Sequence, residues 1–403
     1  MPSHNAPKVI FFANTDWYLY NFRLPLAKAI RDRGGEVVMI SPPGPYGERL
    51  GREGFRWISL PMVRKSLNPL QEVKIVLALA RIYRQERPTL VHHFTLKCVI
   101  YGSIAARLAA VPFIVNAAAG LGYVFTSRHA KARILKPFVK VILSAVLRSR
   151  DSRLIVQNPD DGDQLVQHKL VEKKRVRLIR GSGVNTELFT PNYPVLPQTP
   201  LRVLLATRLL WDKGVREYVD AARSLKAGGV ELEFLLAGTS DNGNPASISD
   251  KQIEAWVREG VITPLGHVED MRLLLATTDM VVLPSYGEGV PRILLEAAAC
   301  GLPIVTTDVP GCREIVVHGK NGLLVSPRDA ASLASAIRQL AEDSDLRADM
   351  GRAGREIAQT EFDERRVIAE TIAVYDELVT AGQVAVVRDI GESQEQFSES
   401  GGQ

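Results

Sequence analysis

Short apolar runs, each followed by a stretch with apolar residues at helical spacing, repeat along both halves of the chain. In the first half the runs cover residues 9–13, 36–41, 90–94, 111–116, 154–158 and 176–179. In the second half they cover residues 202–206, 232–238, 280–283 and 304–307. Continuous apolar runs are typical of strands buried on both faces of a parallel sheet, with helices as the crossover connections. The pattern predicts the α/β fold class, with two doubly wound, Rossmann-like domains.

Proline and polar residues mark the limits of the predicted domains. Residues 193–200 are rich in proline and lack apolar periodicity, which is typical of a linker. We therefore expect one domain over residues 1–190 and a second over residues 200–360. An amphipathic helix is expected over residues 361–382, and the polar tail 391–403 is expected to be disordered.

The composition is that of an ordinary water-soluble protein. Of the 403 residues, 46% are hydrophobic and 24% are charged, and the net charge is +5. The cysteines Cys98, Cys300 and Cys312 lack metal-ligand spacing and fit a reducing compartment. Residues 1–5 are polar, and no apolar run reaches the roughly 18–20 residues that span a bilayer. We therefore expect a cytoplasmic protein without disulfide bonds.

Residues 127–150 form a basic segment whose apolar residues have helical spacing. The segment contains seven Lys or Arg and no acidic residue. Such helices bind anionic membrane surfaces, where each cation contributes on the order of 1 kcal/mol. The alternative is a helix packed on its own domain with a solvated basic face. Nucleic acid is disfavoured because aromatic residues are nearly absent here. The residues predicted to bind the inner face of the cell membrane are Arg128, Lys131, Arg133, Lys136 and Lys140.

A glycine-rich loop, SYGEGVP, lies between the predicted strand 280–283 and a predicted helix over residues 292–300. A loop at the carboxyl end of a parallel strand is where α/β sheets bind anionic ligands, because backbone N–H groups approach a diphosphate closely there. We expect Gly287, Gly289 and Val290 to line such a site. The first strand lacks a following GxGxxG motif, which disfavours a dinucleotide dehydrogenase.

Two carboxylates frame this loop. Glu288 lies within it, and Glu296 lies two turns into the following helix, where both can reach a ligand at the helix start. The alternative is that Glu288 caps the helix and that Glu296 is a solvated side chain. Leu295 and the alanines after Glu296 predict a closely packed helix, which argues against a solvated Glu296.

Two cations, Arg208 and Lys213, follow the predicted strand 202–206. At a strand end they are placed to neutralise the charge that develops on a diphosphate leaving group. The alternative is ordinary surface charge. Arg208, Lys213 and Glu288 are the predicted catalytic residues.

Polar residues and glycines also follow three strands of the first half. Residues 14–23 are expected to form a loop, for which the alternative is a structural turn with a surface arginine. His93 can act as an acid or base near neutral pH, and its alternative is a packed, hydrogen-bonded histidine. The residues predicted to bind an acceptor are Asn21, Arg23, His93, Lys97, Gly120 and Gly122.

The sequence Asp161-Gly162-Asp163 formally matches the Asp-x-Asp pattern that binds a metal-nucleotide in some enzymes. Acidic residues are also favoured at a helix N-terminus. We interpret these residues as the start of a helix and expect no metal site.

Taken together, the Glu-x7-Glu spacing, the GEG before it and the CGLPIVTTDVPGCRE run after it closely resemble the retaining glycosyltransferases of family 4, which have the GT-B fold. The resemblance extends from about Lys8 to about Leu378. It implies two domains that face a cleft, a terminal helix that crosses back to the first domain, and chemistry without a metal or cofactor. It also implies that Glu288 contacts the donor sugar and Glu296 the nucleotide ribose.

The resemblance further implies roles for the flanking residues. Arg208 and Lys213 match the family's donor-phosphate residues, and His267 would lie near the nucleotide base. UDP is the nucleotide that this family commonly uses. The resulting set of predicted donor-binding residues is Arg208, Lys213, His267, Gly287, Glu288, Gly289, Val290 and Glu296.

The chain departs from the broad family after the strand 111–116. Many relatives carry a His-Gly there that contributes to the donor site, whereas this chain has Ala119-Gly120. The missing histidine's role does not transfer to His93. The segment AGLGYVFTS instead resembles a subgroup that builds bacterial polysaccharide and glycan repeat units on polyprenyl diphosphates.

The resemblance therefore implies a retaining transfer of a sugar from a nucleotide-sugar to a polyprenyl-diphosphate-linked saccharide. Three alternatives remain at this point. A nucleotide-sugar 2-epimerase shares the fold and needs no acceptor. A phosphorylase would need a lysine-bound pyridoxal cofactor. A non-catalytic scaffold would bind membranes without consuming a donor.

Overall fold

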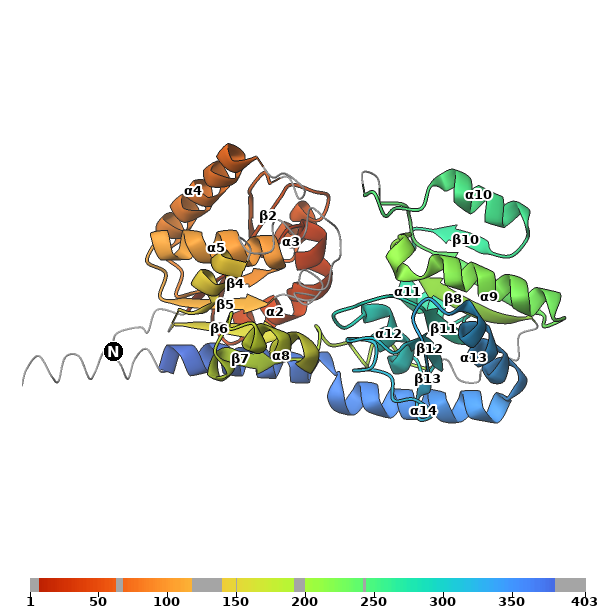
Figure 1. The fold of residues 1–403 in the computed structure, drawn as a ribbon. Coiled ribbons are helices and arrows are strands. Elements are labelled where there is room, and N and C mark those ends of the chain that lie inside the picture. The colour runs from red at the N-terminus through yellow and green to blue at the C-terminus, as the bar shows by residue number, and fades with distance from the viewer. Residues whose placement is uncertain are drawn as a thin grey trace, which may run out of the picture. The chain divides into compact units, whose positions relative to one another are not determined.

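The computed structural model describes residues 7–62, 68–117, 140–149, 151–191, 200–241 and 244–380. It divides into two compact units, each with its own sheet (Figure 1). Unit 1 comprises Met1–Ile179 together with Ile368–Gln403, and unit 2 comprises Arg180–Val367. The chain therefore leaves unit 1 once and returns to it near its end.

Unit 1 is built on a seven-stranded parallel sheet in the order β3-β2-β1-β4-β5-β6-β7. Its strands are β1 Lys8–Phe12, β2 Glu36–Ser41, β3 Arg56–Ser59, β4 Leu90–Phe94, β5 Phe113–Ala117, β6 Ser152–Val156 and β7 Val176–Leu178. Six of these strands were predicted as apolar runs, and all of the six except the half-exposed β7 are mostly buried. The edge strand β3 was missed, because it is only half-buried and its sequence, RWIS, is not an apolar run.

Helices flank this sheet and connect its strands (Figure 1). They are α1 Asp16–Tyr18, the π-helical turn Leu19–Arg23, α2 Leu24–Asp32, α3 Gly47–Arg52, α4 Pro69–Glu86, α5 Leu96–Leu108, residues 140–147, α8 Pro159–Gln167, the 3-10 turn Lys173–Arg175 and residues 364–380. The prediction of a loop over residues 14–23 was wrong from Asp16 onward. Thr15 caps α1 by accepting a hydrogen bond from the Tyr18 backbone N–H.

Alternate residues of the central strands face opposite sides of the sheet, as the two-residue period of a strand requires. Ile10 and Phe12 pack with Leu79 and Tyr83 of α4 on one side. On the other side the Phe11 ring meets the rings of His92 and Phe94 edge-on. Both faces of β1 and β4 are therefore filled, which is why their sequences read as continuous apolar runs.

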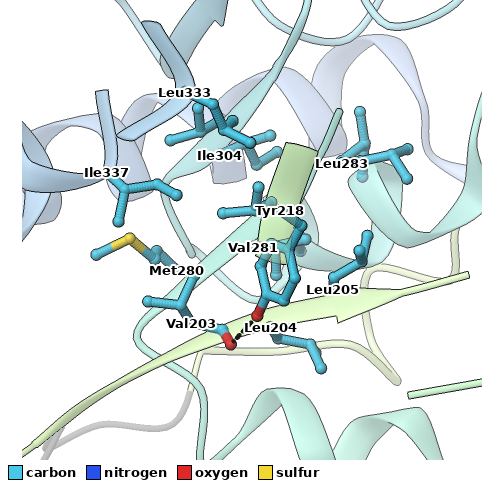
Figure 2. Close-up of a cluster of buried hydrophobic side chains, with 14 of the residues drawn as sticks. Val203, Leu204, Leu205, Tyr218, Met280, Val281, Leu283, Ile304, Leu333 and Ile337 are labelled. Atoms are coloured by element: carbon cyan, nitrogen blue, oxygen red, sulfur yellow. Dashed lines mark hydrogen bonds between the residues drawn. The ribbon is translucent and has the colours of Figure 1, made fainter. Parts of the chain in front are cut away.

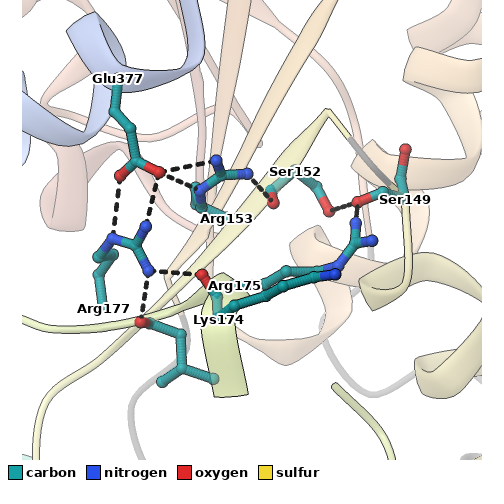
Figure 3. Close-up of polar contacts among 8 residues, drawn as sticks. Ser149, Ser152, Arg153, Lys174, Arg175, Arg177 and Glu377 are labelled. Carbon is teal, nitrogen blue, oxygen red and sulfur yellow. Dashed lines mark hydrogen bonds and ion pairs between the residues drawn. The ribbon is translucent and has the colours of Figure 1, made fainter. Parts of the chain in front are cut away.

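The helix over residues 364–380 is attached to unit 1 by Glu377 (Figure 3). The Glu377 carboxylate accepts hydrogen bonds from Nε and Nη2 of Arg153 at 2.9 and 2.7 Å, and from Nε and Nη2 of Arg177 at 2.9 and 2.6 Å. Burial raises the Glu377 pKa, but the hydrogen bonds from Arg177 and Arg153 outweigh burial and lower it overall. His92 adds a contact, because its Nδ1 lies 2.5 Å from the Tyr375 hydroxyl.

Unit 2 is built on a six-stranded parallel sheet in the order β10-β9-β8-β11-β12-β13. Its strands are β8 Leu201–Ala206, β9 Leu232–Ala237, β10 Thr263–Gly266, β11 Met280–Leu283, β12 Ile304–Thr307 and β13 Gly322–Val325. Its helices are the 3-10 turn Trp211–Lys213, α9 Val215–Ala227, α10 Asp250–Arg258, α11 Met271–Leu275, α12 Arg292–Ala299, α13 Ala330–Glu342 and α14 Ser344–Glu361. The two parallel sheets with their helices confirm the predicted α/β fold class.

The core of unit 2 is formed by its sheet and the helices α9, α12, α13 and α14, and Figure 2 shows the part beside α9 and α13. Val203 and Val281 from adjacent strands are fully buried beside Ile337 of α13. Tyr218 of α9 is also fully buried, and its hydroxyl donates to the carbonyl oxygens of Val203 at 2.7 Å and Leu235 at 3.0 Å. This polar contact fixes α9 against the middle of β8 and β9 without leaving a buried hydroxyl unpaired.

Across the described ranges, no helix combines the length and apolar character needed to cross a bilayer.

Candidate active site

The predicted catalytic residues of unit 2 lie where parallel strands end side by side. β8 pairs with β11, and β11 pairs with β12. Lys213 follows β8 and Glu288 follows β11, so both side chains belong to the carboxyl edge of the sheet. The two residues are 75 positions apart in the chain, and the pairing of β8 with β11 brings them together.

Lys213 and Glu288 form an ion pair at this edge. The Lys213 Nζ lies 2.6 Å from the Glu288 Oε1, and the two side chains are 13% and 15% exposed. Helix α12 begins after Pro291 without a side-chain hydrogen bond to its first turn. The alternative that Glu288 caps this helix was therefore wrong.

The glycine-rich loop is held by contacts that the sequence did not single out. The Tyr286 backbone N–H donates to the Asp212 carbonyl oxygen at 2.9 Å, and the Tyr286 hydroxyl donates to the Glu217 Oε1 at 2.7 Å. The Arg328 guanidinium lies 4.7 Å from the centre of the Tyr286 ring. Burial, and next the hydrogen bond to Glu217, raise the pKa of Tyr286. The loop is thus fastened to residues on both sides of Lys213.

Gly214 permits the close approach of these two segments. Its φ is +72°, and a Cβ at this position would overlap the carbonyl oxygen of Pro284. A side chain is disfavoured by both the left-handed conformation and the steric overlap. In the sequence, the glycine directly after Lys213 was the one sign of this close contact. The glycine is required there because Pro284, at a strand end 70 positions further along the chain, lies against it.

Glu296 is buried in α12 and paired within the same helix. The Arg292 Nε lies 2.7 Å from the Glu296 Oε1, one helical turn away. Burial raises the Glu296 pKa, and the Arg292 charge and hydrogen bond oppose that rise. The alternative of a solvated Glu296 was therefore wrong.

The remaining predicted donor residues are more open. Arg208 is 57% exposed, with its Nη1 3.4 Å from the Asp241 Oδ2. His267 is exposed directly after β10. Gly287 is exposed, with space where a Cβ would be, and Gly289 approaches Gly311 closely. Val290 packs beside Gly181.

Asn21 and Arg23 lie in the π-helical turn of unit 1. The Asn21 Nδ2 donates to the Trp17 carbonyl oxygen at 2.9 Å. Arg23 is buried, its Nη2 donates to the Tyr18 hydroxyl at 2.7 Å, and its guanidinium lies 4.4 Å from the centre of the Phe94 ring. The alternative of a surface arginine was therefore wrong.

His93 is fully buried and both of its ring nitrogens have partners within unit 1. Its Nδ1 lies 2.8 Å from the Asn116 Oδ1, and its Nε2 lies 3.2 Å from the Tyr83 hydroxyl. Burial lowers the His93 pKa to about 4, against a smaller rise from the bond to Asn116. The geometry favours the packed, hydrogen-bonded histidine over an acceptor contact.

Of the other residues predicted to bind the acceptor or the membrane, the structure describes Lys97 and Lys140. Lys97 lies in the first turn of α5 and pairs with Glu72 of α4 at 2.9 Å. Lys140 is exposed on the helical residues 140–147. Outside the described residues lie Gly120, Gly122, Arg128, Lys131, Arg133 and Lys136.

Asp161 and its acidic neighbours lie at the start of α8, as the sequence indicated. Asn158 caps this helix by accepting a hydrogen bond from the Asp161 backbone N–H at 2.8 Å. Asp160 and Asp161 occupy the first helical turn. Their position is explained by the favourable charge of acidic residues at a helix N-terminus.

Comparisons with known proteins identify two glycosyltransferase domains in the chain. The Glycosyl transferase 4-like family matches residues 8–158, and Glycosyl transferases group 1 matches residues 200–343. The chain is 27% identical over 384 residues to the N,N'-diacetylbacillosaminyl-diphospho-undecaprenol alpha-1,3-N-acetylgalactosaminyltransferase of Campylobacter jejuni subsp. jejuni serotype O:2, covering 92% of this chain and 99% of that one. It is 24% identical to the Escherichia coli UDP-Gal:alpha-D-GlcNAc-diphosphoundecaprenol alpha-1,3-galactosyltransferase, covering 75% and 79% of the two chains.

Solved structures show the same fold. Sucrose-phosphate synthase from Thermosynechococcus elongatus superposes with a TM-score of 0.75 at 22% identity, covering 93% of this chain and all of that one. An Anabaena protein determined in complex with UDP-glucose superposes with a TM-score of 0.73 at 21% identity, covering 91% and 99%. With a 4-like domain in its first half, a group 1 domain in its second and the fold of these neighbours, the chain belongs to the GT-B glycosyltransferases and is a hexosyltransferase.

Proposed function

We propose that this enzyme transfers a hexosyl group from a UDP-sugar to a saccharide carried on a polyprenyl diphosphate, with retention of anomeric configuration. The names of the Campylobacter and Escherichia coli relatives specify undecaprenyl-diphosphate-linked sugars, and the second also names a UDP-linked donor. The Anabaena neighbour was determined with UDP-glucose. These three findings support the acceptor class and the nucleotide.

The observation that carries the proposal is the ion pair between Lys213 and Glu288 in a glycine-rich loop at the carboxyl edge of a parallel sheet. A nucleoside diphosphate carries more negative charge than one carboxylate, so it competes with Glu288 for the Lys213 ammonium. Binding of the donor would then release Glu288 to accept hydrogen bonds from sugar hydroxyls. The same lysine would stabilise the diphosphate as the leaving group departs.

We assign the remaining donor contacts to residues around this pair. Arg208 is exposed at the same sheet edge and can reach a phosphate oxygen. The buried carboxylate of Glu296 is held by Arg292 and can accept hydrogen bonds from ribose hydroxyls. His267, Gly287, Gly289 and Val290 would line the remaining donor surface.

The proposed reaction forms one bond and breaks one at the anomeric carbon. The bond to the diphosphate oxygen breaks as the acceptor hydroxyl attacks from the same face, and the acceptor proton passes to the departing diphosphate. We propose no resident cofactor or metal. On the acceptor side we propose Asn21, Arg23 and Lys97, with the enzyme held at the cytoplasmic face of the membrane.

A donor screen tests this function. Purified protein is incubated with UDP-, GDP- and other nucleotide-sugars, with and without membrane lipid extract, and nucleotide release is recorded. Release that requires one UDP-sugar and lipid supports the proposal, and NMR of the product gives the anomeric configuration. Conversion of a donor without acceptor would point to an epimerase, and no consumption of any donor would contradict the proposal.

A matched pair of variants assigns the site. Glu288→Gln removes the carboxylate that pairs with Lys213 and is expected to lower kcat/KM by at least about a hundredfold. Glu259→Gln makes the same change in a more exposed ion pair with Arg223, which is 2.7 Å long, and is expected to leave kcat/KM unchanged. Equal effects of the two substitutions would contradict the assignment.

A further inference from the structure

Helix α4 of unit 1 carries an exposed apolar stripe on its first half. Leu70, Val73 and Leu77 are 76%, 56% and 55% exposed. Their spacing places them on one side of the helix, since residues three, four and seven apart share a face. Three large apolar side chains therefore face solvent together.

This stripe is a second apolar face, because α4 already has a buried one. Leu79 and Tyr83 are buried against the sheet, on the opposite side of the helix. A helix at the surface of a globular protein has one apolar stripe and otherwise presents polar residues to water. Packing within unit 1 therefore explains the buried face and leaves the Leu70 stripe without a function.

The charges of α4 are sorted by sign. Both of its carboxylates are turned inward: Glu72 pairs with Lys97 at 2.9 Å, and Glu86 pairs with Arg56 at 2.8 Å. Within Pro69–Glu86 the exposed charged side chains are Lys74, Arg81 and Arg84. Helical spacing puts these cations on the same side as the apolar stripe, so this side offers apolar groups and positive charge together.

Neighbouring elements extend the same two kinds of side chain. The Arg84 Nη2 donates to the Leu108 carbonyl oxygen at the end of α5, and the Leu108 side chain is half exposed. Arg107 in turn donates to the Ala145 carbonyl oxygen at 2.7 Å. The helical residues 140–147 that it contacts expose Val141.

We infer that the Leu70–Val73–Leu77 stripe of α4 inserts into the headgroup region of an anionic lipid bilayer, with Lys74, Arg81 and Arg84 on lipid phosphates. Interfacial helices bind through this combination of an apolar strip and cations. Charge complementarity selects an anionic bilayer over a second copy of the chain, because two such faces would oppose cation to cation. The inference rests on the proposed lipid-linked acceptor for its purpose, but its test needs no sugar.

Site-specific fluorescence detects insertion directly. The native cysteines Cys98, Cys300 and Cys312 are buried, so a polarity-sensitive thiol dye will label an introduced exposed cysteine. Dye on Leu77→Cys is expected to shift to the blue and brighten on addition of vesicles of 70% phosphatidylcholine and 30% phosphatidylglycerol. Dye on Leu273→Cys, at a 71% exposed leucine of α11 in unit 2, is expected not to respond.

Binding to the same vesicles measures the contribution of the stripe. The combined substitution Leu70→Gln, Val73→Gln and Leu77→Gln is expected to weaken vesicle binding about tenfold or more, whereas Leu273→Gln is expected to leave it unchanged. Wild-type protein should bind vesicles of pure phosphatidylcholine more weakly. The combined variant should keep the wild-type melting temperature, because it changes exposed residues.

Several results would overturn the inference. One is equal vesicle binding by the wild type and the combined variant. Another is a fall in the variant's melting temperature, which would mean that this chain covers the stripe. A wild-type dimer that the variant lacks would assign the stripe to a second copy. Insertion without sugar transfer would contradict the proposed function alone, and transfer without insertion would contradict this inference alone.

Discussion

Replacing His93 with glutamine is expected to make the stability of the protein less sensitive to acid. The neutral imidazole of His93 is enclosed by Tyr83 and Asn116, and its pKa is lowered from an ordinary value of 6.5 to about 4. Between these two pH values the unfolded chain binds a proton at His93 that the folded chain does not. Stability therefore rises with pH across this window and is lost as the pH falls.

The size of the effect follows from the pKa difference. Between pH 7 and pH 5 a shift from 6.5 to 4 changes the free energy of unfolding by about 2 kcal/mol. The difference between the two pH values is the informative quantity, because His93→Gln will also lower stability at pH 7 by disturbing a packed site. A Cβ at Gly102 would overlap the His93 ring, which shows how closely this site is packed.

Urea unfolding at several pH values between 5 and 7 measures this difference. The wild type should lose about 2 kcal/mol more than His93→Gln over this range. The exposed His168 provides the control, and His168→Gln should follow the wild type. A His93→Gln profile parallel to that of the wild type would refute the reasoning. If His93→Gln instead raised the KM for the acceptor and left the pH dependence of stability unchanged, His93 would be assigned to the acceptor site.

Three further predictions concern other described contacts. Glu377→Gln weakens the hydrogen bonds from Arg153 and Arg177 and should cost about 1–2 kcal/mol of stability at pH 7, a moderate loss because Glu377 is partly exposed. In thermal unfolding the control variant Asp376→Asn, at an exposed neighbour, should keep the wild-type Tm. Equal Tm values for the two variants would contradict this prediction. Tyr286→Phe should lower kcat/KM about tenfold through loss of one hydrogen bond in the donor loop, with little change in Tm, whereas wild-type kinetics would show that the bond does not position the loop. All three cysteines are buried, and burial raises each thiol pKa to about 12, so a thiol reagent at pH 8 should label them only after unfolding; fast labelling of the native protein would contradict their burial.

The sequence by itself predicted the parts of this protein that depend on local pattern. Strands buried on both faces produce continuous apolar runs, and six of the seven strands of unit 1 were predicted from such runs. The edge strand β3 carries no such run, and its four residues are exposed or half-buried. The helix start at Asp161 was also predicted, since capping depends on residues only a few positions apart.

Candidate residues were found by type and spacing, whereas their environments were decided by tertiary packing. The sequence placed Lys213 and Glu288 separately at strand ends, and only the pairing of β8 with β11 brings them to 2.6 Å. Tyr286 and Glu217 were missed, because the hydrogen bond between them joins residues 69 positions apart with no local signal.

Periodicity gives the relative positions of residues on a helix or strand, but not what covers each face. His93 lies in a strand buried on both sides, so the sequence allowed either a ligand contact or a packed site. In α4 the structure alone shows that Leu79 is covered while Leu77 is open. Elements distant in the chain determine which side is covered, and for that reason the buried histidine and the exposed stripe appear only once the sheet and its helices are assembled.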